Sequence, residues 1–223
     1  MIALVVVGGL PGTGKSTVAE HVARAIGAAH LSKDIFEAAL WRSGITRESG
    51  AGWAAYEQLG AVAEAQLRVG LPVVLDSVTP NESIRSAWRD IAARTGARFL
   101  AIECVCSDES VHRSRLDGRR RNISGWPEVT WEQVVEVRSR YEPWTADRLV
   151  LDAAAPTNDN LASAEAYVRG RRRPSRAVRS CFASRPSRSP RRRARTARRS
   201  RARTSSIPRS PGARRRTAHL PRS

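Results

Sequence analysis

The stretch VVVGGLPGTGKSTVAEH, Val5 to His21, joins a run of β-branched residues to a segment with helical periodicity. Gly9 to Ser16 fits the pattern G-x-x-x-x-G-K-[ST], with a strand expected before it and a helix after it, as the pattern requires. Glycines allow successive backbone N–H groups to point into one concavity, and the start of the helix adds a partial positive charge. The stretch therefore predicts a loop that binds phosphate groups, and its setting argues against a turn that is merely rich in glycine.

The same pattern predicts roles for individual residues. Lys15 is expected to reach the terminal phosphates of a nucleoside triphosphate, and Ser16 is expected to offer its hydroxyl to Mg²⁺. We therefore expect ATP and Mg²⁺ as cofactors. The residues predicted to bind the nucleotide are Gly9, Leu10, Pro11, Gly12, Thr13, Gly14, Lys15, Ser16 and Thr17.

Charge divides the chain near residue 169. All 21 acidic residues of the protein lie before this point, whereas the residues after it include 20 arginines and no acidic residue. Residues 1–169 are rich in Ala, Val, Leu and Ile and are long enough to bury a core. We predict one domain over 1–169 and a disordered Arg/Ser/Pro-rich tail over 170–223, because the tail has too few large apolar residues to offset its ordering entropy.

The basic tail has two interpretations. Its arginines are suited to nonspecific binding of nucleic acid through phosphate contacts. Alternatively, the tail is not a selected sequence, because Arg, Ser, Pro, Ala, Gly and Thr are the residues that GC-rich codons yield when they are read out of frame. The abrupt loss of acidic residues fits a frameshift or a read-through.

Apolar periodicity predicts alternating strands and helices, which is typical of an α/β fold with a parallel sheet. We expect the three-layer P-loop NTPase fold, with a five-stranded parallel sheet covered by helices on both faces. The expected strands are 2–7, 30–32, 72–76, 98–105 and 148–152. The expected helices are 15–26, 34–42, 52–69, 81–95, 109–116, 131–140 and 160–168.

No apolar stretch reaches the ~18 residues of a membrane span, and the apolar start of the chain lacks the basic region of a signal peptide. We therefore expect a soluble, cytoplasmic protein without a membrane partner. Cys104 and Cys106 alternate along a predicted strand, so both are expected to be buried thiols on one face, and Cys181 belongs to the tail.

Two aspartates follow predicted strands and are candidates for chemistry. Asp34 is expected beside the phosphate loop, where its carboxylate is suited to act as general base, with a helix N-cap as the alternative. Asp76 ends a buried strand and is predicted to bind Mg²⁺ or to orient the acceptor, again with a cap as the alternative. Arg85 follows near the same edge of the sheet and is predicted to contact the acceptor, with an ordinary polar surface residue as the alternative.

The polar loop DGRRRNISGW, 117–126, is predicted to be a mobile lid. Its arginines suit phosphate oxygens, and at least one of Arg115, Arg119, Arg120 and Arg121 is expected to be catalytic. We predict that Arg115, Arg119 and Arg120 are catalytic. The alternative is that the loop is merely basic and solvated, with no role in the reaction.

The histidines and tryptophans of the predicted domain are not assigned to the reaction. The histidines in the predicted domain, His21, His30 and His112, have no partner at metal spacing and are assigned no chemistry. The tryptophans are expected to pack in the core or at an interface, with a platform for the acceptor as the alternative. The residues concerned are Trp41, Trp53, Trp126, Trp131 and Trp144.

The residues at the end of a predicted strand favour phosphoryl transfer to a hydroxyl over ATP hydrolysis. The strand PVVLD ends in Asp76 and Ser77, whereas ATPases that activate water usually end this strand in Asp-Glu. The chain also lacks an Asn-Lys-x-Asp motif for guanine. We therefore expect a kinase, which needs a base, a metal site and cations for the moving phosphoryl group.

GLPGTGKST, LSKD, VVLDS, the arginine-rich loop and WEQVVEVRSRYEPW together resemble the AAA-domain P-loop kinases of bacteria over about residues 2–168. That group includes polynucleotide 5′-hydroxyl kinases, gluconate kinase-like enzymes, chloramphenicol phosphotransferase and zeta toxins. The resemblance implies phosphate and Mg²⁺ binding by Lys15 and Ser16, a general base at Asp34 and lid arginines within 115–121. It also implies that the turn Ala155–Thr157 touches adenine.

The match to polynucleotide kinase is incomplete. Glu37 and Ala38 stand where an arginine for the acceptor phosphate is expected, and no DxDGT-type phosphatase motif follows. The sequence thus favours an ATP-dependent kinase for a small-molecule hydroxyl. The alternatives are a polynucleotide 5′-hydroxyl kinase, a zeta toxin-like sugar-nucleotide kinase, and a nucleic-acid-associated ATP-binding protein that uses its tail.

Overall fold

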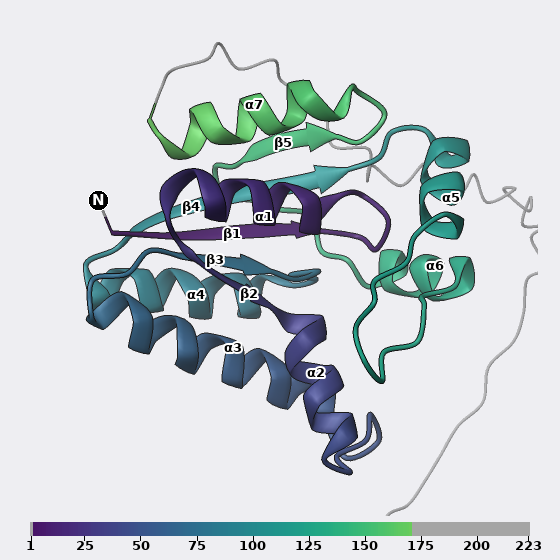
Figure 1. Cartoon of the computed structure of the whole chain (residues 1–223), viewed down its shortest axis with the longest axis horizontal. Coiled ribbons are helices and arrows are strands. Elements are labelled where there is room, and N and C mark those ends of the chain that lie inside the picture. The colour runs from purple at the N-terminus through teal and green to yellow at the C-terminus, as the bar shows by residue number, and fades with distance from the viewer. Residues whose placement is uncertain (1, 171–223) are drawn as a thin grey trace, which may run out of the picture. The chain divides into compact units, whose positions relative to one another are not determined.

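The computed structural model describes residues 2–170, and in this part of the chain five parallel strands form one sheet in the order β2-β3-β1-β4-β5 (Figure 1). The strands are β1 (Ala3–Gly9), β2 (Ala29–Ser32), β3 (Val73–Asp76), β4 (Arg98–Val105) and β5 (Leu149–Asp152). The helices are α1 (Lys15–Ile26), α2 (Lys33–Arg42), α3 (Ala51–Arg68), α4 (Glu82–Thr95), α5 (Glu109–Asp117), α6 (Trp131–Ser139) and α7 (Thr157–Val168).

The central strand β1 is buried along its whole length, as its uninterrupted apolar sequence predicts for a strand covered on both faces. It pairs with β3 on one side and β4 on the other. The register places Asp76 at the end of β3 beside Val7 of β1 and Ser32 of β2. Residues that follow these strands therefore meet at one edge of the sheet, where open α/β sheets bind ligands.

Helices cover both faces of the sheet and complete three layers (Figure 1). On one face, α1 and α7 pack together, with Val18 and Ala164 in a core that includes Val5 and Val7. On the other face, α3 and α4 pack over Leu4 and Val6 of the same strand. Alternate residues of β1 thus enter two cores, and the predicted three-layer fold is confirmed.

The order of elements agrees with the prediction, and the largest boundary difference is at the last helix. We expected this helix to begin at residue 160, but α7 begins at Thr157, directly after Pro156 at the N-cap. The first turn, Thr157–Asn160, is polar and gives no apolar periodicity, so the sequence pattern starts one turn late. Proline is compatible with a helix start because its φ is already close to the helical value.

The prediction that two cysteines share a buried face is only half correct. Cys104 lies inside β4, is 2% exposed, and burial raises the pKa of its thiol to about 12. Because β4 ends at Val105, the alternation of side chains does not continue to Cys106, whose thiol is partly exposed and donates to the Asp108 carbonyl at 3.3 Å. Cys181 and the predicted tail lie outside the described residues.

Within 2–170, no helix has the length and apolar composition needed to cross a bilayer.

Candidate phosphate-binding and phosphoryl-transfer site

The turn between β1 and α1 has the conformation that its glycines allow. Gly9 has φ 142°, and a Cβ there would lie 2.2 Å from the backbone oxygen of Cys104. Gly14, the N-cap of α1, has φ 81° in the left-handed region. Between them, the Thr13 hydroxyl donates to the Leu10 carbonyl at 2.8 Å and closes the turn. The loop therefore ends at a helix N-terminus, which is a favourable place for a phosphate anion.

Lys15, the first residue of α1, is 3% exposed. Burial lowers the pKa of its ammonium, whereas the carboxylates of Asp76 and Asp34 raise it, and the net pKa lies below the ordinary value. The ammonium thus lies within electrostatic reach of the predicted base, Asp34, and of the predicted Mg²⁺ ligand, Asp76. This placement agrees with the role predicted for the lysine of the phosphate loop.

Asp76 is a buried carboxylate at the carboxyl end of β3. Among the described residues, neither of its oxygens has a hydrogen-bond partner, and His30 Nε2 lies 3.8 Å from Oδ2. Burial raises the pKa of Asp76, but His30 and Lys15 contribute to lowering it, and the net pKa lies below the ordinary value. A buried carboxylate whose charged form is favoured lies near the Ser16 hydroxyl, and together the two groups offer suitable oxygen ligands for Mg²⁺.

No cluster of three or more His, Cys, Asp or Glu suited to a metal occurs among residues 2–170. A Mg²⁺ site does not require such a cluster, because the ion is usually held by one or two protein ligands together with phosphates and water. His30, to which we assigned no chemistry from the sequence, lies next to Asp76 and helps to lower the pKa of its carboxyl group.

Asp34 lies in the first turn of α2, but it is not the N-cap. Ser32 holds the N-cap position, with extended backbone at φ −102°. The Asp34 carboxylate instead faces the lid: its Oδ2 lies 3.2 Å from Arg121 Nη2 and 4.0 Å from Arg119 Nη2. The predicted capping alternative is therefore wrong, and the carboxylate is directed at the predicted cations.

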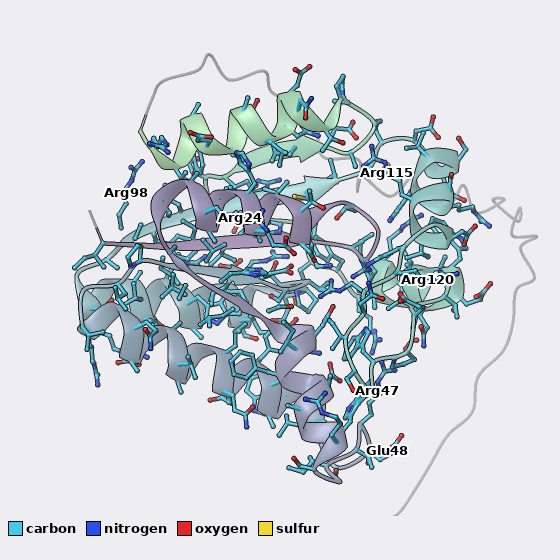
Figure 2. The ribbon with its side chains drawn as sticks, in the orientation of Figure 1. Arg24, Arg47, Glu48, Arg98, Arg115 and Arg120 are labelled. Atoms are coloured by element: carbon cyan, nitrogen blue, oxygen red, sulfur yellow. The ribbon has the colours of Figure 1, made fainter. Side chains whose placement is uncertain are left out.

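The structure brings a different set of arginines to the site than the three we named. Arg121 Nη1 donates to Ser16 Oγ at 2.8 Å, so one guanidinium joins the phosphate loop to Asp34. Arg119 is the only named lid arginine that faces Asp34. Arg115 on α5 and Arg120 in the loop that follows it are both exposed (Figure 2), and Arg120 donates to the Asp117 and Arg119 carbonyls. The lid is irregular here, so the path of its backbone determines which arginines face the site.

Arg85 does not lie where an acceptor can reach it. Its side chain is fully buried, and its guanidinium donates to the carbonyls of Thr79, Pro143 and Glu142 at 3.1, 3.0 and 2.7 Å. Its Cζ also lies 4.3 Å from the ring centroid of Trp144. Arg85 therefore joins α4 to two neighbouring loops, and we no longer count it among the acceptor residues.

Two tryptophans hold the lid against α2. Trp41 of α2 and Trp126 of the lid stack with ring centroids 4.8 Å apart and an angle of 7° between their planes. Arg42 donates to the Ser124 carbonyl at 2.6 Å, which adds a second contact between the lid and α2. Lys33 forms an ion pair with the buried Glu37 and lies 6.0 Å from the Trp126 ring.

The remaining tryptophans divide between core and surface. Trp131 and Trp144 pack against buried neighbours, as expected, whereas Trp53 is 60% exposed and the packing prediction is wrong for it. The predicted adenine turn, 155–157, follows Asp152, whose carboxylate accepts from the backbone of Ser107 and Ala154. The contact of this turn with adenine stays a prediction.

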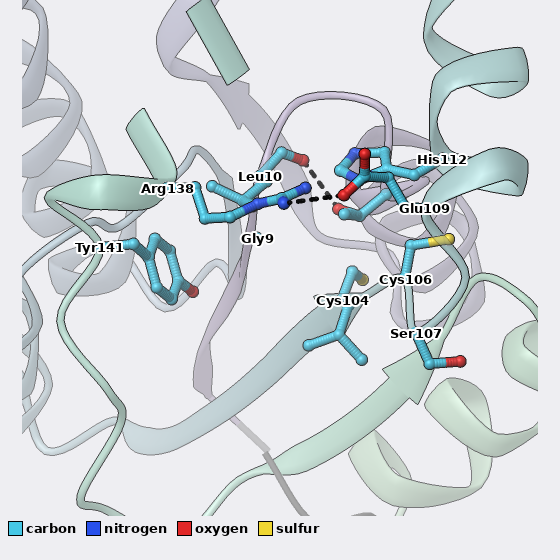
Figure 3. A pocket seen from close by; sticks show the side chains of 11 residues that line it. Gly9, Leu10, Cys104, Cys106, Ser107, Glu109, His112, Arg138 and Tyr141 are labelled. Carbon is cyan, nitrogen blue, oxygen red and sulfur yellow. Dashed lines mark hydrogen bonds and ion pairs between the residues drawn. The ribbon is translucent and has the colours of Figure 1, made fainter. Parts of the chain in front are cut away.

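A cavity of about 150 Å³ lies on another side of the phosphate loop, with His112 and Glu109 on one side and Tyr141 on the other (Figure 3). Lys15, Ser16, Asp34 and Asp76 do not line this cavity, so we do not assign it to the phosphates of the nucleotide. Its lining residues are Gly9, Leu10, Thr13, Cys104, Val105, Cys106, Ser107, Glu109, His112, Arg138 and Tyr141.

The sequences of known proteins align with most of this chain. It is 29% identical over 174 residues to an uncharacterised protein of Mycobacterium tuberculosis, and the match covers 73% of this chain. The chain spans about a third of the length of that relative, 34%. It is also 27% identical over 169 residues to a probable adenylyl-sulfate kinase of Aeropyrum pernix, with 70% of this chain and 85% of the relative covered.

Solved structures with this fold include kinases. A gluconokinase from Sinorhizobium meliloti superimposes with a TM-score of 0.56 and 21% identity, over 76% of this chain and 92% of its own. The APS kinase of Mycobacterium tuberculosis, solved with AMPPNP and APS, gives a TM-score of 0.51 and 23% identity, over 75% and 96% of the two chains. These likenesses show the fold.

A model of the AAA-domain family matches residues 4–144. The match runs from β1 to the segment after α6 and so includes the phosphate loop, Asp34, Asp76 and the lid. The chain therefore belongs to the AAA-domain family of P-loop proteins.

Proposed function

We propose that this protein is an ATP-dependent kinase that transfers the γ-phosphoryl group to a hydroxyl of a small-molecule acceptor. One observation carries the proposal: the Arg121 guanidinium contacts both Ser16 of the phosphate loop and the Asp34 carboxylate. A cation, a phosphate-binding hydroxyl and a candidate base thus converge at one edge of the sheet. Phosphoryl transfer to a hydroxyl requires this combination.

The phosphate loop would hold the β- and γ-phosphates against the N-terminus of α1, with Lys15 neutralising part of their charge. Ser16 and Asp76 would hold Mg²⁺, which supplies positive charge to the phosphate oxygens when it is bound. The AMPPNP complex of the M. tuberculosis APS kinase supports ATP as the nucleotide.

Asp34 would accept the proton of the acceptor hydroxyl. The pair Arg119 and Arg121 would donate hydrogen bonds to the transferring phosphoryl group, whose oxygens carry spread charge in the transition state. The residue after Asp76 is Ser77 rather than a glutamate that could activate water. An acceptor hydroxyl is thus the better nucleophile for this site.

A small acceptor is favoured by the neighbourhood of Asp34. One turn further along α2, Glu37 is 3% exposed and paired with Lys33, so a carboxylate stands where an arginine for a nucleic-acid phosphate is expected. The activities of two similar proteins, a gluconokinase and a probable adenylyl-sulfate kinase, support a small acceptor. We place the reaction in the cytoplasm, where ATP is abundant.

Transfer from γ-labelled ATP tests the proposal. The full chain is incubated with a metabolite extract and, separately, with a 5′-hydroxyl oligonucleotide, and Asp34→Asn serves as the control. Label on a small molecule that disappears in D34N supports the proposal. Label on the oligonucleotide supports the polynucleotide kinase alternative instead, and tight ATP binding without transfer to either acceptor contradicts the kinase function.

A further inference from the structure

His112 is a buried histidine that takes no part in the proposed phosphoryl-transfer steps. It lies on α5, is 2% exposed, and its Nε2 is 2.7 Å from the carbonyl oxygen of Pro11 in the phosphate loop. A carbonyl only accepts, so Nε2 must carry the proton and donate it. Burial lowers the pKa of the His112 imidazole, which favours the neutral ring with this one donor.

The contact determines the orientation of one peptide in the loop. In a trans peptide the C=O and the following N–H point in opposite directions. Because the Pro11 carbonyl is directed at His112, the N–H of Gly12 is directed away from α5. The ring also packs closely, since a Cβ on Gly12 would lie 3.0 Å from His112 Cδ2. The loop can therefore not rotate this peptide without losing a buried hydrogen bond.

The same ring is held by both helices that bound the lid. His112 belongs to α5, which ends at Asp117 where the lid begins. Trp131, the first residue of α6, meets the His112 ring edge-on at 5.2 Å and 85°. Arg113 and Arg138 lie 4.4 and 5.2 Å from the Trp131 ring, so that ring is itself fixed in place. The phosphate loop and the two ends of the lid thus meet at one side chain.

We propose that His112 is a positioning residue that orients the Pro11–Gly12 peptide so that the Gly12 N–H faces the phosphates, and that it ties the loop to both ends of the lid. The inference rests on the proposed function insofar as the loop holds the phosphates of ATP. The residue touches no reacting atom, so its effect is on phosphate affinity.

The test compares His112→Phe, which keeps a ring of similar size but has no donor, with His112→Gln, which keeps an N–H donor. Calorimetry on the full chain measures the Kd for AMPPNP and for inorganic tripolyphosphate with Mg²⁺, and for adenosine without phosphate. We expect H112F to weaken AMPPNP and tripolyphosphate about tenfold or more, as the loss of one buried hydrogen bond predicts. H112Q should recover most of that affinity, and adenosine binding should not change.

His21→Phe is the matched control, because His21 is partly exposed and pairs with Glu165 on α7, away from the loop. Wild-type affinity of H112F for tripolyphosphate would overturn the inference, as would an equal loss of adenosine affinity, which indicates general damage. If H112F does not fold, His112→Asn replaces it, since the shorter amide does not reach Pro11. Tripolyphosphate binding that depends on His112 without AMPPNP binding would contradict the proposed function but support this inference.

Discussion

Among single residues, the arginines of the lid differ in the groups that their guanidinium groups contact. Arg119 and Arg121 face Asp34, and Arg121 also reaches Ser16, whereas Arg120 turns outward to backbone carbonyls. Neighbours in sequence with identical chemistry therefore have different expected roles. The contrast provides a matched comparison inside one loop.

Replacement of Arg121 by alanine should lower kcat about 10²- to 10³-fold, since it removes a donor that is aimed at developing charge. Arg120→Ala, the matched control, should keep kcat within a few-fold of the wild type. Steady-state kinetics with the identified acceptor measure both. Equal losses in the two variants would show that the lid acts only through its total charge.

The buried Arg85 gives a prediction about stability. Arg85→Met leaves the carbonyls of Thr79, Glu142 and Pro143 without their donor, and should lower the free energy of unfolding by about 3 kcal/mol or more. Arg89→Met, one turn along α4, removes a partly exposed partner of Glu82 and should cost much less. Urea unfolding of both variants is the measurement. A stable R85M with a raised KM for the acceptor would restore the original assignment of Arg85.

The sequence predicts those site residues that depend on local geometry. The phosphate loop is one continuous pattern, and Asp34 and Asp76 follow strands whose ends meet at a sheet edge. The choice between Arg120 and Arg121 depends on the path of an irregular loop, which no periodicity encodes. The roles of Arg85 and His112 depend on carbonyls far away in the chain, at Pro143 and Pro11, so no local signal revealed them.

At the scale of elements, the lid docks on the helix that carries the candidate base. The Trp41–Trp126 stack and the hydrogen bond from Arg42 to Ser124 both join the lid to α2. Arg121 reaches Asp34 from the same loop. Closure of the lid and the position of α2 are thus linked through these contacts.

A double-mutant cycle with Trp41→Ala and Trp126→Ala measures this docking. We expect a coupling free energy of about 0.5–1.5 kcal/mol, which is typical of an aromatic pair. Trp53→Ala combined with Trp126→Ala is the control, because Trp53 is 60% exposed, and its coupling should be close to zero. Additive effects of the Trp41 and Trp126 changes on unfolding would show that the stack does not hold the lid.

At the scale of the whole molecule, residues 2–170 contain a sheet of five strands with helices on both faces and the full candidate site. The alternating pattern predicts a parallel sheet covered by helices, whereas the strand order β2-β3-β1-β4-β5 is known only from the pairing of the strands. The predicted boundary at residue 169 rests on composition, since the tail lies outside the described residues.

A chain that ends at residue 170 should bind ATP with the affinity of the full chain and unfold at the same temperature. Its affinity for nucleic acid should fall, because the removed residues carry the excess of arginine. Calorimetry with AMPPNP, thermal unfolding and a salt titration of oligonucleotide binding test these outcomes. Loss of ATP binding on truncation would contradict the proposed domain boundary.

Phosphorus NMR of ATP turnover by the full chain tests whether the γ-phosphoryl group goes to a hydroxyl or to water, because it distinguishes a phosphate ester from inorganic phosphate. In a metabolite extract, we predict a new phosphate monoester signal that grows as the γ-phosphate signal declines, and that is lost in the Asp34→Asn variant. Release of inorganic phosphate alone, at the same rate with and without the extract, would rule out the proposed kinase activity and identify water as the acceptor.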